Sequence, residues 1–83
     1  MHLSLYYYDT CPFCQRVLMA MRSFKNLQIE KRNVMFKSGF AKEQRQATGR
    51  STVPCLRIQK DGDVEWMYES SEIVRYLRDL NQA

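Results

Sequence analysis

The sequence predicts an α/β fold with a four-stranded mixed sheet and three helices in the order βαβαββα. An apolar, strand-like run near the N-terminus is followed at once by a stretch with helical periodicity. A hairpin signal, Asp61-Gly62, separates two later runs of strand character, and the C-terminal segment has the pattern of an amphipathic helix. With 83 residues, 45% of them apolar, we expect one domain over residues 1–83 with one core.

The first half of the chain predicts a strand, a helix and a second strand. Residues 3–8 are rich in aromatic side chains and predict the first strand. Thr10 is a candidate N-cap for the helix that follows, and Pro12 suits its first turn, where a missing N–H is no loss. The helix is expected to end near residues 24–26, because apolar side chains recur at helical spacing: Val17, Leu18, Met21 and Phe24. Residues 27–34 alternate weakly and predict a second strand, parallel to the first because a helix connects the two.

The middle of the chain predicts a second, shorter helix and a third strand. The helix is expected over residues 38–47, with Gly49 ending it. Thr52-Val53-Pro54 then leads into a strand over residues 55–59.

The last third predicts a hairpin partner and a final helix. Residues 64–68 alternate and predict a fourth strand, antiparallel to the third across the Asp61-Gly62 turn. The final helix is expected to begin at Glu69-Ser70-Ser71, with Ser70 as its cap. Its expected buried face is formed by Ile73, Val74, Leu77 and Leu80.

The charge pattern restricts the partners. The net charge is +4, and the basic residues are concentrated in the middle third: Lys31, Arg32, Lys37, Lys42, Arg45 and Arg50. This pattern is typical either of a solvated face or of an electropositive surround that attracts an anionic thiol. We expect no nucleic-acid partner, because no nucleic-acid motif and no regular basic–aromatic stripe is present.

The chain is expected to work in the cytoplasm, away from membranes. No apolar run approaches the roughly 20 residues that span a bilayer, and the first residues lack the pattern of a signal peptide. Its three cysteines cannot all pair within one chain, which favours a reducing compartment.

The most specific chemical signal is Cys11-Pro12-Phe13-Cys14, which lies at the predicted junction between the first strand and the first helix. A helix N-terminus offers unpaired N–H groups and a positive dipole end, both of which stabilise a thiolate. The thiolate is the nucleophile of thiol–disulfide exchange. Two cysteines at this spacing near a βαβ pattern therefore indicate a redox motif.

Three segments in order give the chain a resemblance to a glutaredoxin. They are Tyr8 to Cys14, then Thr52-Val53-Pro54, then Glu69 to Leu77. The sequence resembles in particular the type of glutaredoxin that is also similar to the N-terminal thioredoxin-fold domain of glutathione transferases. The resemblance implies a thioredoxin-like fold and a glutathione-dependent disulfide oxidoreductase, with glutathione as its reducing co-substrate.

The resemblance also implies a glutathione site. Val53-Pro54, preceded by Thr52, is similar to the family's cis-proline segment, whose backbone faces the cysteines and pairs with a thiol peptide as an added strand would. Glu69-Ser70 resembles the acid–serine pair that holds the γ-glutamyl end, since a carboxylate pairs with an ammonium and a helix N-terminus binds a carboxylate. The glycyl carboxylate is expected near Arg50, with Lys37 or Arg45 as alternatives.

The implied mechanism gives the two cysteines different roles. Cys11, nearest the helix N-terminus and solvent, is expected to attack a mixed disulfide, and Cys14 to resolve protein disulfides. The implied partners are glutathione and disulfide-bearing or glutathionylated proteins, with the chain acting as a monomer. One departure from the family pattern is Tyr8, which stands where many glutaredoxins carry a lysine, so the helix terminus has to stabilise more of the thiolate charge.

Other interpretations remain open from the sequence. A zinc set of Cys11, Cys14, Cys55 and His2 lacks the usual second pair, so no metal is expected. Some glutaredoxins bridge an iron–sulfur cluster between two chains, and a transferase-like domain can bind glutathione without turnover. Thioredoxin is the nearest enzymatic rival, but its usual Trp-Cys-Gly-Pro-Cys sequence is absent. Cys55 is expected to be a buried structural thiol.

Overall fold

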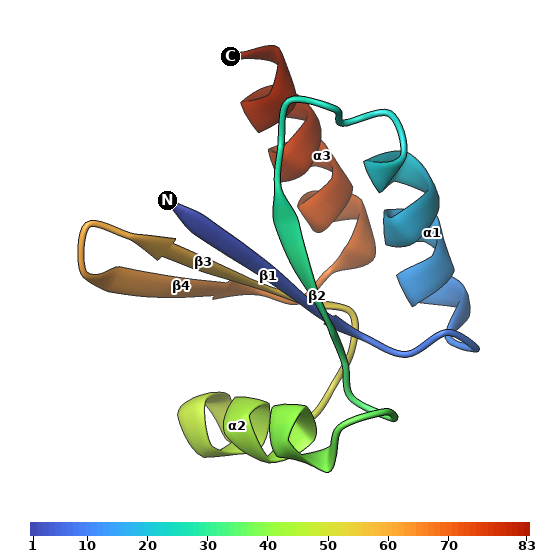
Figure 1. The fold of residues 1–83 in the computed structure, drawn as a ribbon, viewed down its shortest axis with the longest axis vertical. Coiled ribbons are helices and arrows are strands. Elements are labelled where there is room, and N and C mark those ends of the chain that lie inside the picture. The colour runs from blue at the N-terminus through green and yellow to red at the C-terminus, as the bar shows by residue number, and fades with distance from the viewer.

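The computed structural model describes residues 1–83, apart from the side chain of Ser38. The elements follow the predicted order βαβαββα (Figure 1): β1 (His2–Tyr7), α1 (Pro12–Met21), β2 (Ile29–Asn33), α2 (Ser38–Thr48), β3 (Cys55–Lys60), β4 (Asp63–Met67) and α3 (Ser70–Gln82). The strands form one mixed sheet in the order β2-β1-β3-β4. β1 is parallel to β2, whereas β3 is antiparallel to both of its neighbours, so the predicted thioredoxin-like arrangement is confirmed.

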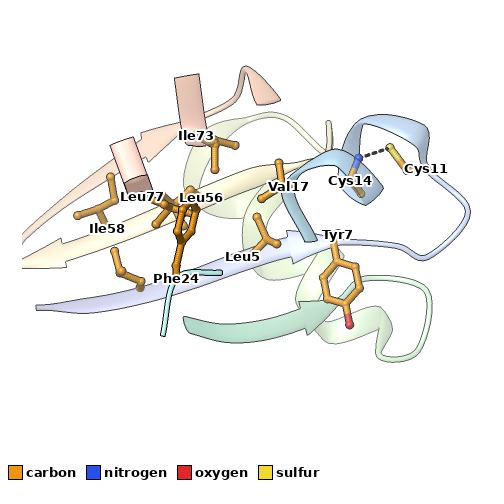
Figure 2. Close-up of a cluster of buried hydrophobic side chains, with 11 residues drawn as sticks. Leu5, Tyr7, Cys11, Cys14, Val17, Phe24, Leu56, Ile58, Ile73 and Leu77 are labelled. Atoms are coloured by element: carbon orange, nitrogen blue, oxygen red, sulfur yellow. Dashed lines mark hydrogen bonds between the residues drawn. The ribbon is translucent and has the colours of Figure 1, made fainter. Parts of the chain in front are cut away.

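The hydrophobic core lies between the sheet and the pair of helices α1 and α3. Figure 1 shows these two helices side by side, with α2 on the other side of the sheet. Val17 of α1 and Ile73 and Leu77 of α3 are fully buried against Leu5 of β1 and Leu56 of β3 (Figure 2). The apolar periodicity of α3 therefore marks its core face correctly, although Val74 and Leu80 are only partly buried.

α2 is attached to the opposite face of the sheet mainly through polar groups. The hydroxyl of the buried Tyr6 donates a hydrogen bond to Glu43 of α2 and accepts one from Arg32 Nη1 at 2.7 Å. Arg32 also forms ion pairs with Glu43 at 2.5 Å and with Glu30 at 3.0 Å. Burial, with the Glu43 contact added, raises the pKa of Tyr6 to about 12, so its hydroxyl stays a donor at neutral pH. Gln44 is the only buried side chain among those described in α2.

Three predicted boundaries and caps are wrong by a few residues. α1 ends at Met21 and not near residues 24–26, because the next backbone N–H groups bond three residues back and tighten the last turn; the Phe24 amide, for instance, bonds to the Met21 carbonyl at 3.1 Å. The N-cap of α1 is Cys11 and not Thr10, since the Cys11 sulfur accepts the Cys14 N–H. The cap of α3 is Glu69, and Ser70 is its first helical residue.

The predicted turn residues lie where the backbone requires them. Asp61 and Gly62 have φ angles of 52° and 87°, which is the left-handed pair that a two-residue type I′ hairpin turn needs between β3 and β4. Gly49, with φ 75°, ends α2 in the left-handed conformation. Within the part of the chain that the structure describes, no helix is both long and apolar enough to cross a membrane.

Candidate active site

The two motif cysteines lie at the N-terminus of α1, close to the end of β1. Cys11 caps the helix, and the backbone N–H of Cys14 donates to Cys11 Sγ at 3.4 Å (Figure 2). This N–H is one of the groups that a helix N-terminus leaves without an intrahelical partner. Cys11 is 5% exposed and Cys14 is completely buried, so both are enclosed and Cys11 is the more accessible.

The environments of the two thiols differ electrostatically. A thiolate at Cys11 would accept a charge-assisted hydrogen bond from the Cys14 amide at the positive end of α1. Cys14 lies one turn inside, where burial raises the pKa of its thiol to about 12. Cys55 begins β3, and burial likewise raises the pKa of its thiol to about 12. At neutral pH, Cys14 and Cys55 therefore hold their protons.

We expect neutral alkylation to distinguish these cysteines. Iodoacetamide at pH 7 should leave Cys14 and Cys55 of the folded, reduced protein largely free, because only a thiolate reacts and burial raises their pKa values to about 12. Cys11, whose sulfur lies at the positive end of α1, should be modified before them. Since the pKa values of Cys14 and Cys55 are raised to about 12, labelling of these two should increase about tenfold per pH unit as the pH rises towards that value. Peptide mass spectrometry measures the sites, with denatured protein as the control that labels all three. Equal neutral labelling of Cys11 and Cys55 in the folded state would contradict the assignment.

The Val53-Pro54 segment faces the cysteines. The peptide bond between these residues is cis, as predicted. The Cys11 thiol contacts the Val53 carbonyl oxygen, with 4.0 Å between the sulfur and the oxygen. Thr52 makes a different contact, because its carbonyl accepts a hydrogen bond at 2.8 Å from Nε2 of Gln44 in α2. The backbone of Val53 is thus the part of the segment nearest to Cys11.

A small surface hollow is lined by residues of two of the predicted motifs, Val53-Pro54 and Glu69-Ser70. Its volume is about 260 Å³, and it is lined by the predicted residues Val53, Pro54, Glu69 and Ser70, together with Phe13, Arg16, Tyr68 and Ser71. The floor includes the N-terminus of α3, where backbone N–H groups lack intrahelical partners and favour an anion. The exposed Glu69 carboxylate beside it favours a cation. The hollow therefore suits a ligand that carries a carboxylate and an ammonium on neighbouring atoms.

The cations around this hollow differ in part from those expected. Arg50 does not line it, but its guanidinium lies 4.7 Å from the centre of the Tyr68 ring, which does. Lys37 instead lies against Phe40, with 5.8 Å between its ammonium and the ring centre, and Arg45 is exposed on α2. Neither of these two alternatives reaches the hollow.

Four residues of the hollow were not among the predicted site residues: Phe13, Arg16, Tyr68 and Ser71. Arg16 lies three residues after Phe13 on the same face of α1, with its guanidinium 5.9 Å from the Phe13 ring. The spacing of three residues between Phe13 and Arg16 in the sequence could have indicated that both side chains lie on one face of the helix. Tyr68 directly precedes Glu69 in the sequence, but the sequence indicated it only as the last residue of the fourth strand.

The residues of the nominal zinc set are not gathered. His2 lies at the start of β1, and its Nε2 contacts Glu30 at 2.8 Å, whereas Cys11 follows the other end of that strand. Among the side chains that the structure describes, no group of three His, Cys, Asp or Glu is placed to hold a metal ion.

The fold and the site together define a thioredoxin-like domain with a two-cysteine motif at one helix N-terminus and a candidate anion site at another. A family model described as the glutathione S-transferase N-terminal domain matches residues 5–83, and the chain belongs to this family. The resemblance to glutathione transferases is thereby confirmed at the level of the domain family.

Solved structures give the same result. The chain is similar to TDR1, a trimeric glutathione transferase of Leishmania, with 32% identity and a TM-score of 0.73 over 94% of this chain and 17% of that one. It is also similar to a maleylacetoacetate isomerase of Anaeromyxobacter dehalogenans, with 25% identity, a TM-score of 0.68, and coverage of 98% and 36% of the two chains. A glutathione transferase homologue of Sulfitobacter with bound glutathione has the same fold (18% identity, TM-score 0.73, coverage 98% and 38%).

The chain corresponds to only part of these proteins, since it covers between 17% and 38% of their lengths. A comparison with curated protein sequences found no match.

Proposed function

We propose that this domain is a glutathione-dependent thiol–disulfide oxidoreductase of the glutaredoxin type. The observation that carries the proposal is the position of the Cys11 sulfur, which lies against the Cys14 amide and the Val53 carbonyl. Val53 in turn lines the same hollow as Glu69 and Ser70. A nucleophile, a backbone segment for peptide pairing and a site for an amino-acid end thus lie next to one another, as a thiol tripeptide requires.

We assign glutathione one direction in this site. Its γ-glutamyl carboxylate is assigned to the N-terminus of α3 at Ser70, and its ammonium to Glu69. Its cysteinyl backbone would pair with Val53, which brings its sulfur towards Cys11. The glycyl carboxylate then extends towards the side of the hollow where Arg50 lies over Tyr68. Thr52 supports Val53 through the backbone in this arrangement.

The reaction is two successive exchanges at sulfur. The Cys11 thiolate attacks the glutathione sulfur of a mixed disulfide, forms a new S–S bond, and releases the other thiol as a thiolate that takes up a proton. A second glutathione thiolate then attacks the same sulfur, releasing glutathione disulfide and regenerating the Cys11 thiolate. In net terms, the mixed disulfide and one free glutathione give the substrate thiol and one glutathione disulfide.

The proposal extends to partners and place of action. Glutathionylated and disulfide-bearing proteins are the proposed substrates, with residues 1–83 acting as one monomeric domain in the reducing cytoplasm. Support comes from the exposed Phe13 next to the motif, which offers an apolar contact to a protein substrate. We assign no role in binding nucleic acid, membrane or a resident metal.

A second candidate is a glutathione-binding module of the transferase type, without disulfide exchange. The family match favours it, because the neighbours named as transferases carry this domain as a part of longer chains. The low exposure of Cys11, at 5%, also favours it, since a nucleophile for protein disulfides has to be reached.

One assay separates the two candidates. The reduced protein is given the mixed disulfide of glutathione and a small thiol, with glutathione as the reductant, and glutathione disulfide is measured. In parallel, transfer of glutathione to 1-chloro-2,4-dinitrobenzene is measured. Disulfide turnover supports the oxidoreductase, whereas transfer of glutathione to 1-chloro-2,4-dinitrobenzene without disulfide turnover supports the transferase-type module. Protein that is brown as purified would favour the iron–sulfur alternative.

A further inference from the structure

Gln44 is a polar side chain in a position where an apolar one would be expected. It is completely buried and lies in α2, between residues whose side chains are exposed. Its Nε2 donates to the Thr52 carbonyl at 2.8 Å. Its Oε1 has no hydrogen-bond partner among the atoms that the structure describes.

Burying the oxygen of the Gln44 amide has a cost in folding free energy. A buried carbonyl oxygen that loses its water without gaining a donor costs free energy, and an apolar side chain of similar size would avoid that cost. The hydrogen bond from Gln44 Nε2 leaves α2 and reaches the Thr52 carbonyl before the cis-proline, and the same side chain also forms a hydrogen bond with the Cys55 thiol directly after it. Its effect is therefore on the position of that segment.

The contact belongs to a set that fixes the chain between α2 and β3. Gly49 turns the chain out of the helix, and the Arg50 N–H donates to the Thr48 hydroxyl at 3.0 Å. Gln44 then holds the chain two residues further on, at Thr52. The next residue is Val53, whose carbonyl faces Cys11 Sγ at 4.0 Å. Thr48 and Gln44 thus hold both ends of the short loop that presents the Val53 backbone.

We propose that Gln44 is a positioning residue that holds the Thr52–Val53 backbone in place for glutathione and so sets the affinity of the site without touching the ligand. The inference rests on the proposed function, because it concerns the same site. Without the amide, the Thr52 carbonyl loses its donor and the Val53 peptide is held only through its chain neighbours. Cys11 keeps the Cys14 N–H at the first turn of α1 and loses at most its 4.0 Å contact with the Val53 carbonyl, so its reactivity towards a small reagent should change little.

The test compares Gln44→Met with Gln46→Met. Gln46 is an exposed residue two positions further along the same helix, so the pair controls for the chemical change. For Gln44→Met we expect the KM for glutathione to rise about tenfold with kcat changed less than about twofold, which is the loss of roughly one hydrogen bond to the bound state. The midpoint of thermal unfolding should be unchanged or higher, and the rate of Cys11 alkylation by iodoacetamide should change little. Gln46→Met should equal the wild type in all four measurements.

A structural readout keeps the inference separate from the proposed function. Amide hydrogen exchange at Val53 should become about tenfold faster in Gln44→Met and stay the same in Gln46→Met. If the wild type turns over with glutathione and Gln44→Met keeps its KM and its Val53 exchange rate, the inference is overturned and the function stands. If the wild type shows no glutathione-dependent activity, the function fails, and the Val53 exchange rate alone decides whether Gln44 holds this segment. A Gln44→Met protein that does not fold would show a structural residue and overturn the proposal.

Discussion

Replacing Cys11 with serine is expected to lower glutathione-dependent disulfide reduction by at least about a thousandfold. A serine hydroxyl is not ionised at neutral pH and cannot form the mixed disulfide that the mechanism requires. The loss follows from the position of Cys11, whose sulfur contacts both the Cys14 amide and the Val53 carbonyl. The assay is the rate of glutathione disulfide formation from a small mixed disulfide.

The matched variant Cys14→Ser should behave differently. Cys14 is fully buried and protonated at neutral pH, so we expect it to take no part when a second glutathione resolves the intermediate on Cys11. Reduction of small mixed disulfides should therefore remain within about threefold of the wild type, while reduction of a protein disulfide should fall more than about tenfold. Equal loss of both activities in Cys14→Ser, or retained activity in Cys11→Ser, would show that the two roles are wrongly assigned.

The fold could be predicted from the sequence where the signals are local. The Asp61-Gly62 turn depends on two residues that adopt a left-handed backbone, and the core face of α3 depends on a spacing that any apolar side chain satisfies. The end of α1 could not be predicted from local sequence signals. Phe24 continues the apolar spacing, yet its side chain reaches the core from a turn that has left the α-helical pattern. The cap was missed because cysteine sulfur rarely serves as the acceptor at a helix N-terminus.

The site was predictable only as far as its motifs extend. Cys11, Val53 and Glu69 each belong to a short sequence pattern, and the chain brings Val53 and Glu69 to one hollow beside Cys11. Gln44 belongs to no such pattern, because a glutamine in a polar helix carries no local sign that it is buried. Contacts between α2 and the loop before β3 alone reveal it.

The charge of the protein could also be predicted from the sequence only in part. The basic middle third was open to two interpretations, a solvated face or an electropositive surround for an anionic thiol. Arg32 has its charge compensated by Glu30 and Glu43 on the far face of the sheet, so it contributes little to such a surround. Arg16 lines the hollow instead, and Arg50 lies 4.7 Å from the ring centre of Tyr68, which also lines it. Net charge therefore indicated a basic protein but did not locate the charges that face the site.

Replacing Glu69 with glutamine is expected to raise the KM for glutathione by about 10- to 100-fold, which is the range for one charge-assisted hydrogen bond. Glu69 lines the hollow, and it is the carboxylate that we assign to the ammonium of the γ-glutamyl end. The substitution keeps the size of the side chain and removes only its charge. Since Cys11 is held by α1, kcat should change less than about threefold.

The matched control for this variant is Glu72→Gln. Glu72 lies in the first turn of the same helix, so it interacts with the same helix dipole, but it does not line the hollow. A rise in KM of equal size in both variants would mean that the charge acts through the helix and not on the ligand. A glutathione analogue without the α-amino group completes a double-mutant cycle between Glu69 and the ligand. The wild type should bind this analogue as weakly as Glu69→Gln binds glutathione. Glu69→Gln should bind the analogue no more weakly than the wild type does. If Glu69→Gln binds the analogue still more weakly than the wild type does, the ammonium contacts another group. The contact between the ammonium and Glu69 is already missing once either partner is removed, so removing both should lower the affinity no further.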